Sequence, residues 1–231
     1  MNLDIIIPTL NEKENLMSLI RYLIDNTSNS TKIFIIDSIK SNDDVQQLCN
    51  HSKVQYKRSK YAGRSKQMNE GAQMGDGTAL MFLHADVRPP KNFEQLILDK
   101  LKNGYNAGFF SYKFDNSSFL LKINEYFTNF DGKFAGGGDQ CQFFTRQLFE
   151  EYNGYRDDFI IMEDFEMINR LRQNKESYAI IREPAKVSSR KYINNSYLKV
   201  NLINLMTFIK YNNNVSQEDL KDFYSKSLNP W

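Results

Sequence analysis

Polar side chains follow three predicted strands of this chain, at the points where the strands end. They are Thr9, Asn11 and Glu12 after the first strand, Asp37 after the second, and His84 and Asp86 after the fourth. Ligands of open parallel sheets gather at the carboxyl ends of the strands, so we expect these side chains to share one cleft. Each acid alone is also typical of a helix or turn cap, but three acids at three strand ends favour a ligand site.

Asp86 gives the clearest indication of a metal ion. It follows a fully apolar strand, residues 78–83, and precedes Arg88-Pro89-Pro90. Mg²⁺ and Mn²⁺ typically bind one or two carboxylates together with substrate phosphates and water. Asp86 is therefore a candidate ligand for an ion that bridges to a phosphorylated substrate. His84 is a weaker candidate, because a lone histidine beside a strand end is more often a hydrogen-bonding residue.

Two glycine-led segments offer further substrate contacts. Arg64 and Lys66 stand near the start of a predicted helix, where free N–H groups and the positive end of the dipole favour a pyrophosphate. A basic pair on a helix is, however, usually a solvated face. Gly136-Gly137-Gly138 permits close backbone approach to a ligand, and Asp139-Gln140 can bind hydroxyl groups. A plain turn would explain the glycines alone.

Acids also open a later predicted helix, at Glu163, Asp164 and Glu166. Acids in the first turn complement the helix dipole, which is the ordinary structural reason for them. An adjacent pair can also supply a general base if one carboxylate projects into the cleft. Glu163 and Asp164 are therefore candidates for substrate contact and proton transfer.

The elements that must position these groups alternate between strand and helix. Apolar runs predict strands at 3–8, 32–37, 54–58, 78–83, 107–114, 142–145 and 178–182. Helical periodicity predicts helices at 12–26, 43–50, 63–74, 91–102, 117–130, 163–173 and 196–211. This order predicts an α/β fold with a mostly parallel sheet, right-handed crossovers and a helical carboxy-terminal appendage.

Composition and missing motifs exclude several classes of protein. The chain has 231 residues, 41% of them hydrophobic and 25% charged, as in ordinary globular domains. Its net charge of +2 gives no indication of a nucleic-acid partner. The GxxxxGK[ST] and GxSxG motifs are absent, no GxGxxG follows the first strand, and Cys and His are too few for a zinc site. The two cysteines favour reduced thiols over a disulfide.

Segments near both ends of the chain indicate where in the cell the protein is expected. Residues 1–8 are typical of a buried strand and not of a signal peptide. No apolar stretch approaches the ~20 residues of a spanning helix, so we expect a cytoplasmic protein. The predicted helix 196–211 is apolar over a wide arc with cations in or near it. Packing on the core or in a homodimer is the ordinary interpretation. Peripheral contact with the inner face of the membrane, where a lipid-linked acceptor would be presented, is the functional alternative.

Five segments, in this order, resemble the family-2 glycosyltransferases of GT-A fold, and among them a small bacterial subgroup, the selenodomain-associated transferases. They are DIIIPTLNE at 4–12, GRSKQMN at 63–69, FLHAD at 82–86, GGDQ at 137–140 and MED at 162–164. The resemblance implies a three-layer α/β/α sandwich as a single domain over 1–231. Within it, 1–90 would bind the nucleotide, 91–185 the sugar and acceptor, and 186–231 would form the terminal helices.

The resemblance also implies a role for each matched residue. Asp164 would be the catalytic base, and Asp86 would be the last acid of the Asp-x-Asp metal motif, holding Mn²⁺ or Mg²⁺. The implied nucleotide-binding residues are Pro8, Thr9, Glu12, Asp37, Arg64 and Asn69. The implied sugar- and acceptor-binding residues are Gly138, Asp139, Gln140 and Glu163.

The implied reaction is an inverting transfer from a nucleotide-diphosphate-sugar, a UDP-sugar being favoured, to an acceptor hydroxyl. The chain departs from the family pattern after Asp37, where the usual Asp-Gly-x-Ser-x-Asp is DSIKSND, and at His84, which replaces the first metal-motif acid. A nucleotide-sugar-binding homologue without catalysis is therefore an alternative. A nucleotidyltransferase is another, although the chain lacks a glycine-rich loop after the first strand.

Overall fold

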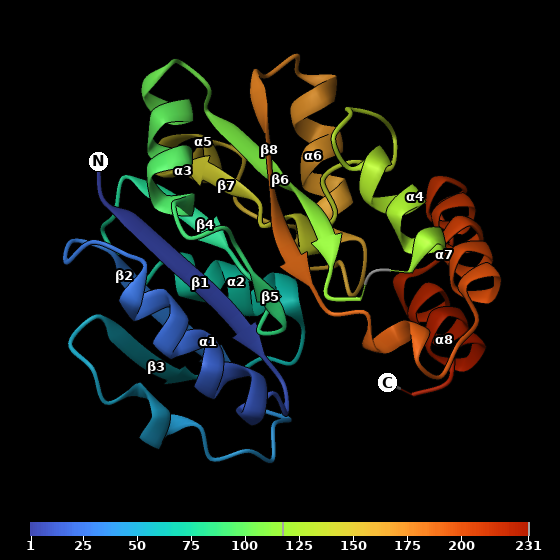
Figure 1. The fold of residues 1–231 in the computed structure, drawn as a ribbon, viewed down its shortest axis with the longest axis horizontal. Helices are drawn as coiled ribbons and strands as arrows, with labels where there is room; N and C mark the ends of the chain where they lie inside the picture. Colours follow the sequence, from blue (N-terminus) through green and yellow to red (C-terminus); the bar gives the residue numbers. More distant parts are fainter. Residues whose placement is uncertain (117, 231) are drawn as a thin grey trace.

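The computed structural model describes residues 1–116 and 118–230, and in this part of the chain one eight-stranded sheet runs through the molecule (Figure 1). The strand order is β3-β2-β1-β4-β7-β6-β8-β5. Strand β1 pairs in parallel with β2 and β4, β2 with β3, and β6 with β8, whereas β7 and β5 run antiparallel to their neighbours. The strands are β1 (Leu3–Thr9), β2 (Lys32–Asp37), β3 (Val54–Arg58), β4 (Ala79–Phe82), β5 (Val87–Arg88), β6 (Ala107–Phe114), β7 (Phe143–Thr145) and β8 (Tyr178–Val187).

Alternate residues of the strands divide the core into two layers. In β1, Ile5 and Ile7 pack on one face of the sheet, and Ile6 packs on the other. The first face is covered by α1 (Lys13–Asp25) and α3 (Phe93–Lys102). The second is covered by α2 (Arg64–Ala72), α5 (Arg146–Glu151) and α6 (Glu163–Gln173). A sheet covered on both faces needs apolar residues at every strand position, which explains the unbroken apolar runs of β1 and β2.

Three more helices lie beside this sandwich, at the right of Figure 1. They are α4 (Phe119–Phe127), α7 (Tyr197–Asn212) and α8 (Gln217–Ser227). Short 3₁₀ turns complete the fold: η1 (Gln46–Cys49), η2 (Gly138–Gln140) and η3 (Arg190–Tyr192). The three-layer sandwich with a helical carboxy-terminal appendage is confirmed.

The predicted elements match the structure to within a few residues, with some differences. The helix expected at 43–50 is only the turn η1, and β8 extends to Val187 beyond its expected end at 182. Strand β5 and helices α5 and α8 had no counterpart in the prediction, and Ser117, the expected first residue of one helix, lies outside the described residues. Cys49 and Cys141 are both free, and burial raises the pKa of each thiol, so the expected absence of a disulfide is confirmed.

The start of β1 is fixed to the second half of the chain by a buried ion pair. Arg146 lies 2.8 Å from the Asp4 carboxylate and also donates to the carbonyl oxygens of Ala72 and Gly77. The Gly77 N–H donates to the same Asp4 oxygen at 2.8 Å. Burial raises the pKa of Asp4 against the opposing effects of these two partners. The pair therefore aligns the central strand with the turn before β4.

We predict that Arg146→Gln lowers the free energy of unfolding by about 3 kcal/mol, because it leaves a buried carboxylate without its cation. Urea unfolding measures this loss, which should be larger at pH 8 than at pH 4, where Asp4 can be protonated. Lys226→Gln is the control, since it breaks an exposed pair with Asp222 and should change stability little. Equal effects of the two variants would contradict the prediction.

Candidate active site at the carboxyl edge of the sheet

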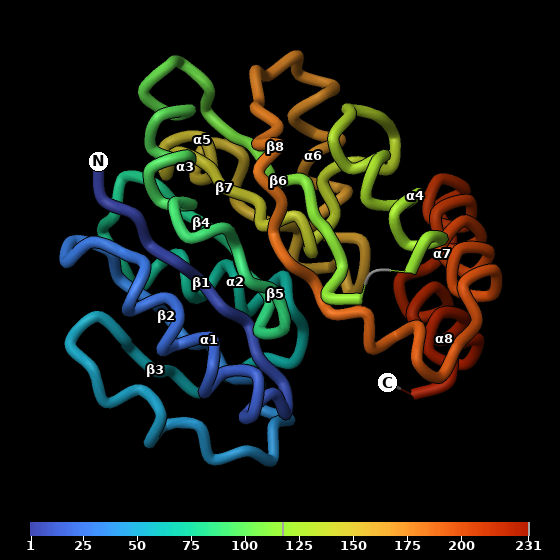
Figure 2. The backbone as a smooth tube through the Cα atoms, in the orientation of Figure 1, coloured from blue at the N-terminus to red at the C-terminus, as the bar shows by residue number. Residues whose placement is uncertain are grey.

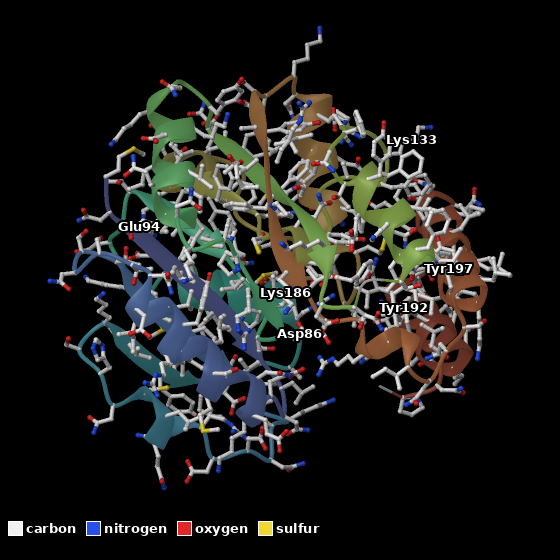
Figure 3. All side chains as sticks on the ribbon, viewed as in Figure 1. Asp86, Glu94, Lys133, Lys186, Tyr192 and Tyr197 are labelled. Carbon is white, nitrogen blue, oxygen red and sulfur yellow. The ribbon has the colours of Figure 1, made fainter. Side chains whose placement is uncertain are left out.

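The strand-end acids do gather at one edge of the sheet, and acids from two later segments join them. Figure 3 shows Asp86 at this edge, between the sheet and the carboxy-terminal helices. The carboxylates of the site are Glu12, Asp37, Asp86, Asp139, Glu163 and Asp164. Four of these carboxylates, those of Glu12, Asp37, Asp86 and Glu163, pair with arginines from elsewhere in the chain. The site is therefore a network of ion pairs and not a set of separate helix caps.

Arg190 in η3 connects two of the strand ends. Its guanidinium lies 2.8 Å from Glu12 and 3.0 Å from Asp86. Asn15 holds the other Glu12 oxygen at 2.6 Å. In the sequence, Arg190 is one of the cations near the predicted helix 196–211, and nothing local marks it as a site residue. Its pairing with Glu12 spans 178 positions of the chain.

Thr9 and Asp37 meet at the ends of β1 and β2. The Thr9 hydroxyl donates to Asp37 at 3.0 Å, and Arg58 at the end of β3 lies 2.5 Å from the other Asp37 oxygen. Asp37 is buried. Pro8 follows Ile6, which is the last residue of β1 that pairs with β4. The missing N–H of Pro8 therefore removes no hydrogen bond between β1 and β4. Arg58 was not among the predicted site residues.

The segment after β2, which lacks the family's glycines, folds without backbone strain. None of its described residues from 38 to 45 has a positive φ. The left-handed residue is instead Asn11, whose side chain accepts from the Asn42 N–H at 2.7 Å. Asp43 accepts from the Lys13 N–H and so holds the start of α1. Glycine is therefore not needed in this segment, although its sequence departs from the family pattern.

Arg64, at the start of α2, pairs with a predicted sugar-side residue. Its Nε lies 2.8 Å from Glu163, which is fully buried, and the second Glu163 oxygen has no hydrogen-bond partner among the described residues. Asn69, on the same helix, makes different contacts. It donates to the Tyr155 carbonyl and accepts from the Tyr155 N–H, tying α2 to the loop before α6. Arg64 thus joins the carboxylates of the site, whereas Asn69 holds α2 against the loop before α6.

Asp164 is held by two backbone N–H groups at the start of α6. The Gly138 N–H donates to one oxygen, and the Phe165 N–H donates to the other at 2.7 Å. Burial, together with the charge of Glu163, raises the pKa of Asp164 to about 6 despite the nearby Arg64. A carboxylate with a pKa in this range is unprotonated at neutral pH and basic enough to accept a proton.

Two glutamines shape the loop that faces Asp164. Gln140 is buried, accepts from the Gly136 N–H at 2.7 Å and donates to the Phe110 carbonyl at 2.9 Å. Gln142 donates to the carbonyls of Gly136 and Asp164. The side chain of Gln140 therefore supports the glycine segment from inside, whereas the resemblance implied a contact with the sugar. Gln142 was not among the predicted residues.

Asp139 and Gly138 lie against His84 at the end of β4. The His84 Nδ1 is 3.3 Å from Asp139. A Cβ added to Gly138 would lie 2.5 Å from the His84 ring and 2.8 Å from Asp164, so only glycine allows the loop to approach both. His84, Glu163 and Asp164 line a small cavity at this point. The histidine is a hydrogen-bonding residue here, as the sequence favoured.

Left-handed backbone occurs in both segments that meet at the Gly138–Asp164 contact. Met162, directly before Glu163, has φ 64°, and Cys141, directly after Gln140, has φ 50°. Residues other than glycine and asparagine adopt this left-handed conformation at a cost, which is of order 1–3 kcal/mol at functional sites. The chain therefore reverses sharply on either side of the Gly138–Asp164 contact.

The donor set fits a divalent ion only together with a substrate. Within residues 1–116 and 118–230, no group of three or more His, Cys, Asp or Glu side chains could hold an ion. Asp86 supplies one carboxylate, and Arg190 already pairs with it. Mg²⁺ is commonly bound by one or two carboxylates plus substrate phosphates. Asp86 is compatible with that mode of binding, and the ion would compete with Arg190.

The fold and this site define a glycosyltransferase of GT-A fold. The family model for glycosyl transferase family 2 matches residues 4–160, and the chain belongs to this family. No curated protein matches the chain. The selenodomain subgroup stays a prediction.

Solved structures show the same fold at low sequence identity. S. aureus TarS 1-349 has a TM-score of 0.68 and 12% identity, with 98% of this chain and 70% of that chain covered. The same protein in complex with UDP-GlcNAc has a TM-score of 0.67 and 13% identity, with coverage of 98% and 71%. Mannosyltransferase PcManGT from Pyrobaculum calidifontis, in complex with GDP-Man and Mn2+, has a TM-score of 0.70 and 12% identity, with coverage of 90% and 61%.

We predict that Gly138→Ala lowers the rate of sugar transfer about 100-fold, because the new methyl group would clash with the His84 ring and the Asp164 carboxylate and displace them. Gly132→Ala is the matched control, since a Cβ there meets nothing within 4 Å. Initial rates of both variants, with thermal unfolding to confirm folding, measure the effect. Full activity of a folded Gly138→Ala protein would contradict the close contact.

Proposed function

We propose that this protein transfers a sugar, with inversion, from a nucleotide-diphosphate-sugar to an acceptor hydroxyl, and that Asp164 is the base. The observation that carries the proposal is the placement of Asp164. Two backbone N–H groups fix its carboxylate, its pKa is raised to about 6, and it lines a cavity beside His84, which lies two positions before Asp86.

The proposed step is a single displacement. The acceptor oxygen attacks the anomeric carbon on the side opposite the nucleotide, and its proton passes to Asp164. The bond from the anomeric carbon to the diphosphate oxygen breaks, and the nucleoside diphosphate leaves with the bonding electrons. The opposed directions of attack and departure invert the configuration. Glu163, tied to Arg64, would orient the sugar with its second, unpartnered oxygen.

The donor would lie across the ends of β1, β2 and β4. Thr9, Glu12 and Asp37 would form the nucleoside end, and Arg64 and Arg190 would face the diphosphate. Proteins of the same fold have been solved in complex with UDP-GlcNAc and with GDP-Man and Mn2+, which supports a nucleotide-diphosphate-sugar as the donor. We favour a UDP-sugar. When bound, Mn²⁺ or Mg²⁺ would offset charge on the leaving diphosphate, with Asp86 as its protein ligand.

A protein that binds the nucleotide-sugar without transferring it is the second candidate. It is favoured by the pairing of Asp86 with Arg190, because an ion that must compete with Arg190 for Asp86 would offset less charge on a leaving diphosphate. Binding without turnover is its signature. Sugar transfer by the wild-type protein would exclude it.

The experiment that tests the donor is a thermal-shift panel of UDP, GDP, CDP, TDP and ADP, each with and without Mn²⁺ and Mg²⁺. A nucleotide at 100 times its Kd adds about 2.7 kcal/mol of stability to the folded state. We predict stabilisation by UDP that requires the metal, and its loss in Asp86→Ala. Asp222→Ala, which removes an exposed acid of α8, is the control and should keep it. Stabilisation of Asp86→Ala equal to wild type would contradict the metal assignment.

We predict that Asp164→Asn keeps the nucleotide-induced thermal shift but lowers kcat about 10²- to 10⁴-fold, since the amide cannot accept the proton. Titration of the donor by thermal shift separates this effect from loss of binding. Transfer at the normal rate by Asp164→Asn would rule out Asp164 as the base.

The pH profile is a second readout of the same assignment. Because the base must be unprotonated, kcat/KM should be constant above pH about 6 and fall below it as Asp164 takes up a proton. Glu163→Gln removes a neighbouring negative charge that raises this pKa, so it should move the falling limb to lower pH. An unmoved limb in a folded, active Glu163→Gln protein would assign the limb to another group.

A further inference from the structure

Two helices beside the active site expose a large apolar surface. Phe119 is 77% exposed and Leu198 is 76% exposed, and neither lies at a loop tip. We call this surface the α4–α7 face. It comprises Phe119, Ile123, Tyr126, Phe127 and Phe130 of α4 and the turn after it, and Leu198, Leu202, Leu205, Met206 and Ile209 of α7. Helix α7 packs inward through Val200, Thr207 and Phe208, so its expected core packing holds for that side alone.

The two apolar stripes face the same side of the molecule. Asn124 of α4 contacts Tyr197 and Asn201 near the start of α7, and Phe134, farther along the chain, contacts Phe208. The two helices therefore run in the same direction, as Figures 1 and 2 also show. Successive residues of an α-helix lie about 100° apart around the helix axis. In each helix the apolar stripe therefore lies about a quarter turn from the side that contacts the other helix, and this rotation has opposite senses in α4 and α7. In helices that run alike, this places both stripes on one face.

The charges around the α4–α7 face are positive. Lys122 and Lys199 are exposed beside the stripes, and Lys133 is exposed in the loop after α4. The sequence has no acid between Glu183 and Glu218. The three acids near α4 have other partners, because Asp115 accepts from the Ser189 N–H, Glu125 accepts from the Phe114 N–H, and Asp131 pairs with Arg172. Apolar stripes edged by lysines are typical of helices that lie in the surface of an anionic bilayer.

The α4–α7 face continues to the acceptor side of the site. The Phe208 ring lies 4.6 Å from Phe134 and 5.9 Å from Phe165, measured between ring centroids. Phe165 follows Asp164 directly and lies so close to Gly137 that a Cβ there would be 3.1 Å from its ring. The α4–α7 face therefore lies only two aromatic side chains, Phe208 and Phe165, from the proposed base, which suits an acceptor presented at a lipid surface.

We propose that the α4–α7 face docks on an anionic lipid bilayer and that the acceptor hydroxyl belongs to a lipid-linked molecule in it. The acceptor part rests on the proposed function, whereas the docking does not. Among the described residues, no helix is long and apolar enough to cross a membrane, so the helices lie in the bilayer surface. A two-fold dimer through this face would bring the lysine borders of both copies together, which disfavours a second copy as the occupant.

Sedimentation with vesicles tests the docking. The full chain is mixed with vesicles of phosphatidylcholine alone or with about 30% phosphatidylglycerol. We expect binding to the anionic vesicles, at least about tenfold weaker binding by Phe119→Ser/Leu198→Ser, and weakened, less salt-dependent binding by Lys122→Glu/Lys199→Glu. Met17→Ser/Ile39→Ser removes two apolar residues that are also more than half exposed, but elsewhere, and should bind as wild type.

Two outcomes overturn the proposal: no binding to anionic vesicles, or equal binding by Phe119→Ser/Leu198→Ser and wild type. If vesicle binding is absent and the protein is a dimer in solution that this variant abolishes, the occupant of the face is a second copy. Failure of the proposed function is seen separately. If no nucleotide stabilises the chain but the vesicles still bind it, the transfer proposal fails and the docking stands. If transfer to a water-soluble acceptor is unchanged in Phe119→Ser/Leu198→Ser and vesicle binding is lost, the docking stands and the lipid-linked acceptor does not.

Discussion

The structure of the site depends on one constraint, which is that several carboxylates must share one edge of the sheet. Burying a carboxylate without a partner is costly, and like charges nearby add to the cost. The chain meets the constraint with arginines from distant segments. Arg58 pairs with Asp37, Arg64 with Glu163, and Arg190 with both Glu12 and Asp86. Because these cations come from β3, α2 and η3, the acids that would bind the donor also fix the positions of three separate segments.

The same constraint explains why Asp164 differs from its neighbours. Arg64 is engaged by Glu163, and Asp164 is held by the N–H groups of Gly138 and Phe165. Burial and the adjacent Glu163 charge then raise its pKa to about 6. Two adjacent carboxylates in different surroundings thus acquire different properties, one suited to holding a hydroxyl or a cation and the other to accepting a proton.

Local features of the sequence predicted the framework, because apolar runs, periodicity and glycines act over a few residues. The strand-end acids were found in this way, since the ends of parallel strands must meet at one edge. Pairing between residues far apart in the sequence could not be predicted from such local features. Arg190 is far from Glu12 in sequence, and β5 is a two-residue strand that exists only because β8 pairs with it. Gln140 shows that a matched motif is also not enough to predict a side chain's role. The motif does not tell whether the amide faces the ligand or, as here, supports the loop from behind.

The family model matches residues 4–160, and three features of the proposed mechanism and docking lie beyond it, which are Asp164, Arg190 and α7. The last third of the chain therefore supplies the proposed base, a cation opposite Asp86 and the α7 stripe of the α4–α7 face. Phe208 connects these parts physically, since it packs against Phe165 beside the proposed base and lies on the inner side of α7. Because interiors are closely packed, we expect a shift of α7 to be felt at Phe165, so the proposed base and the α7 stripe depend on the same packing.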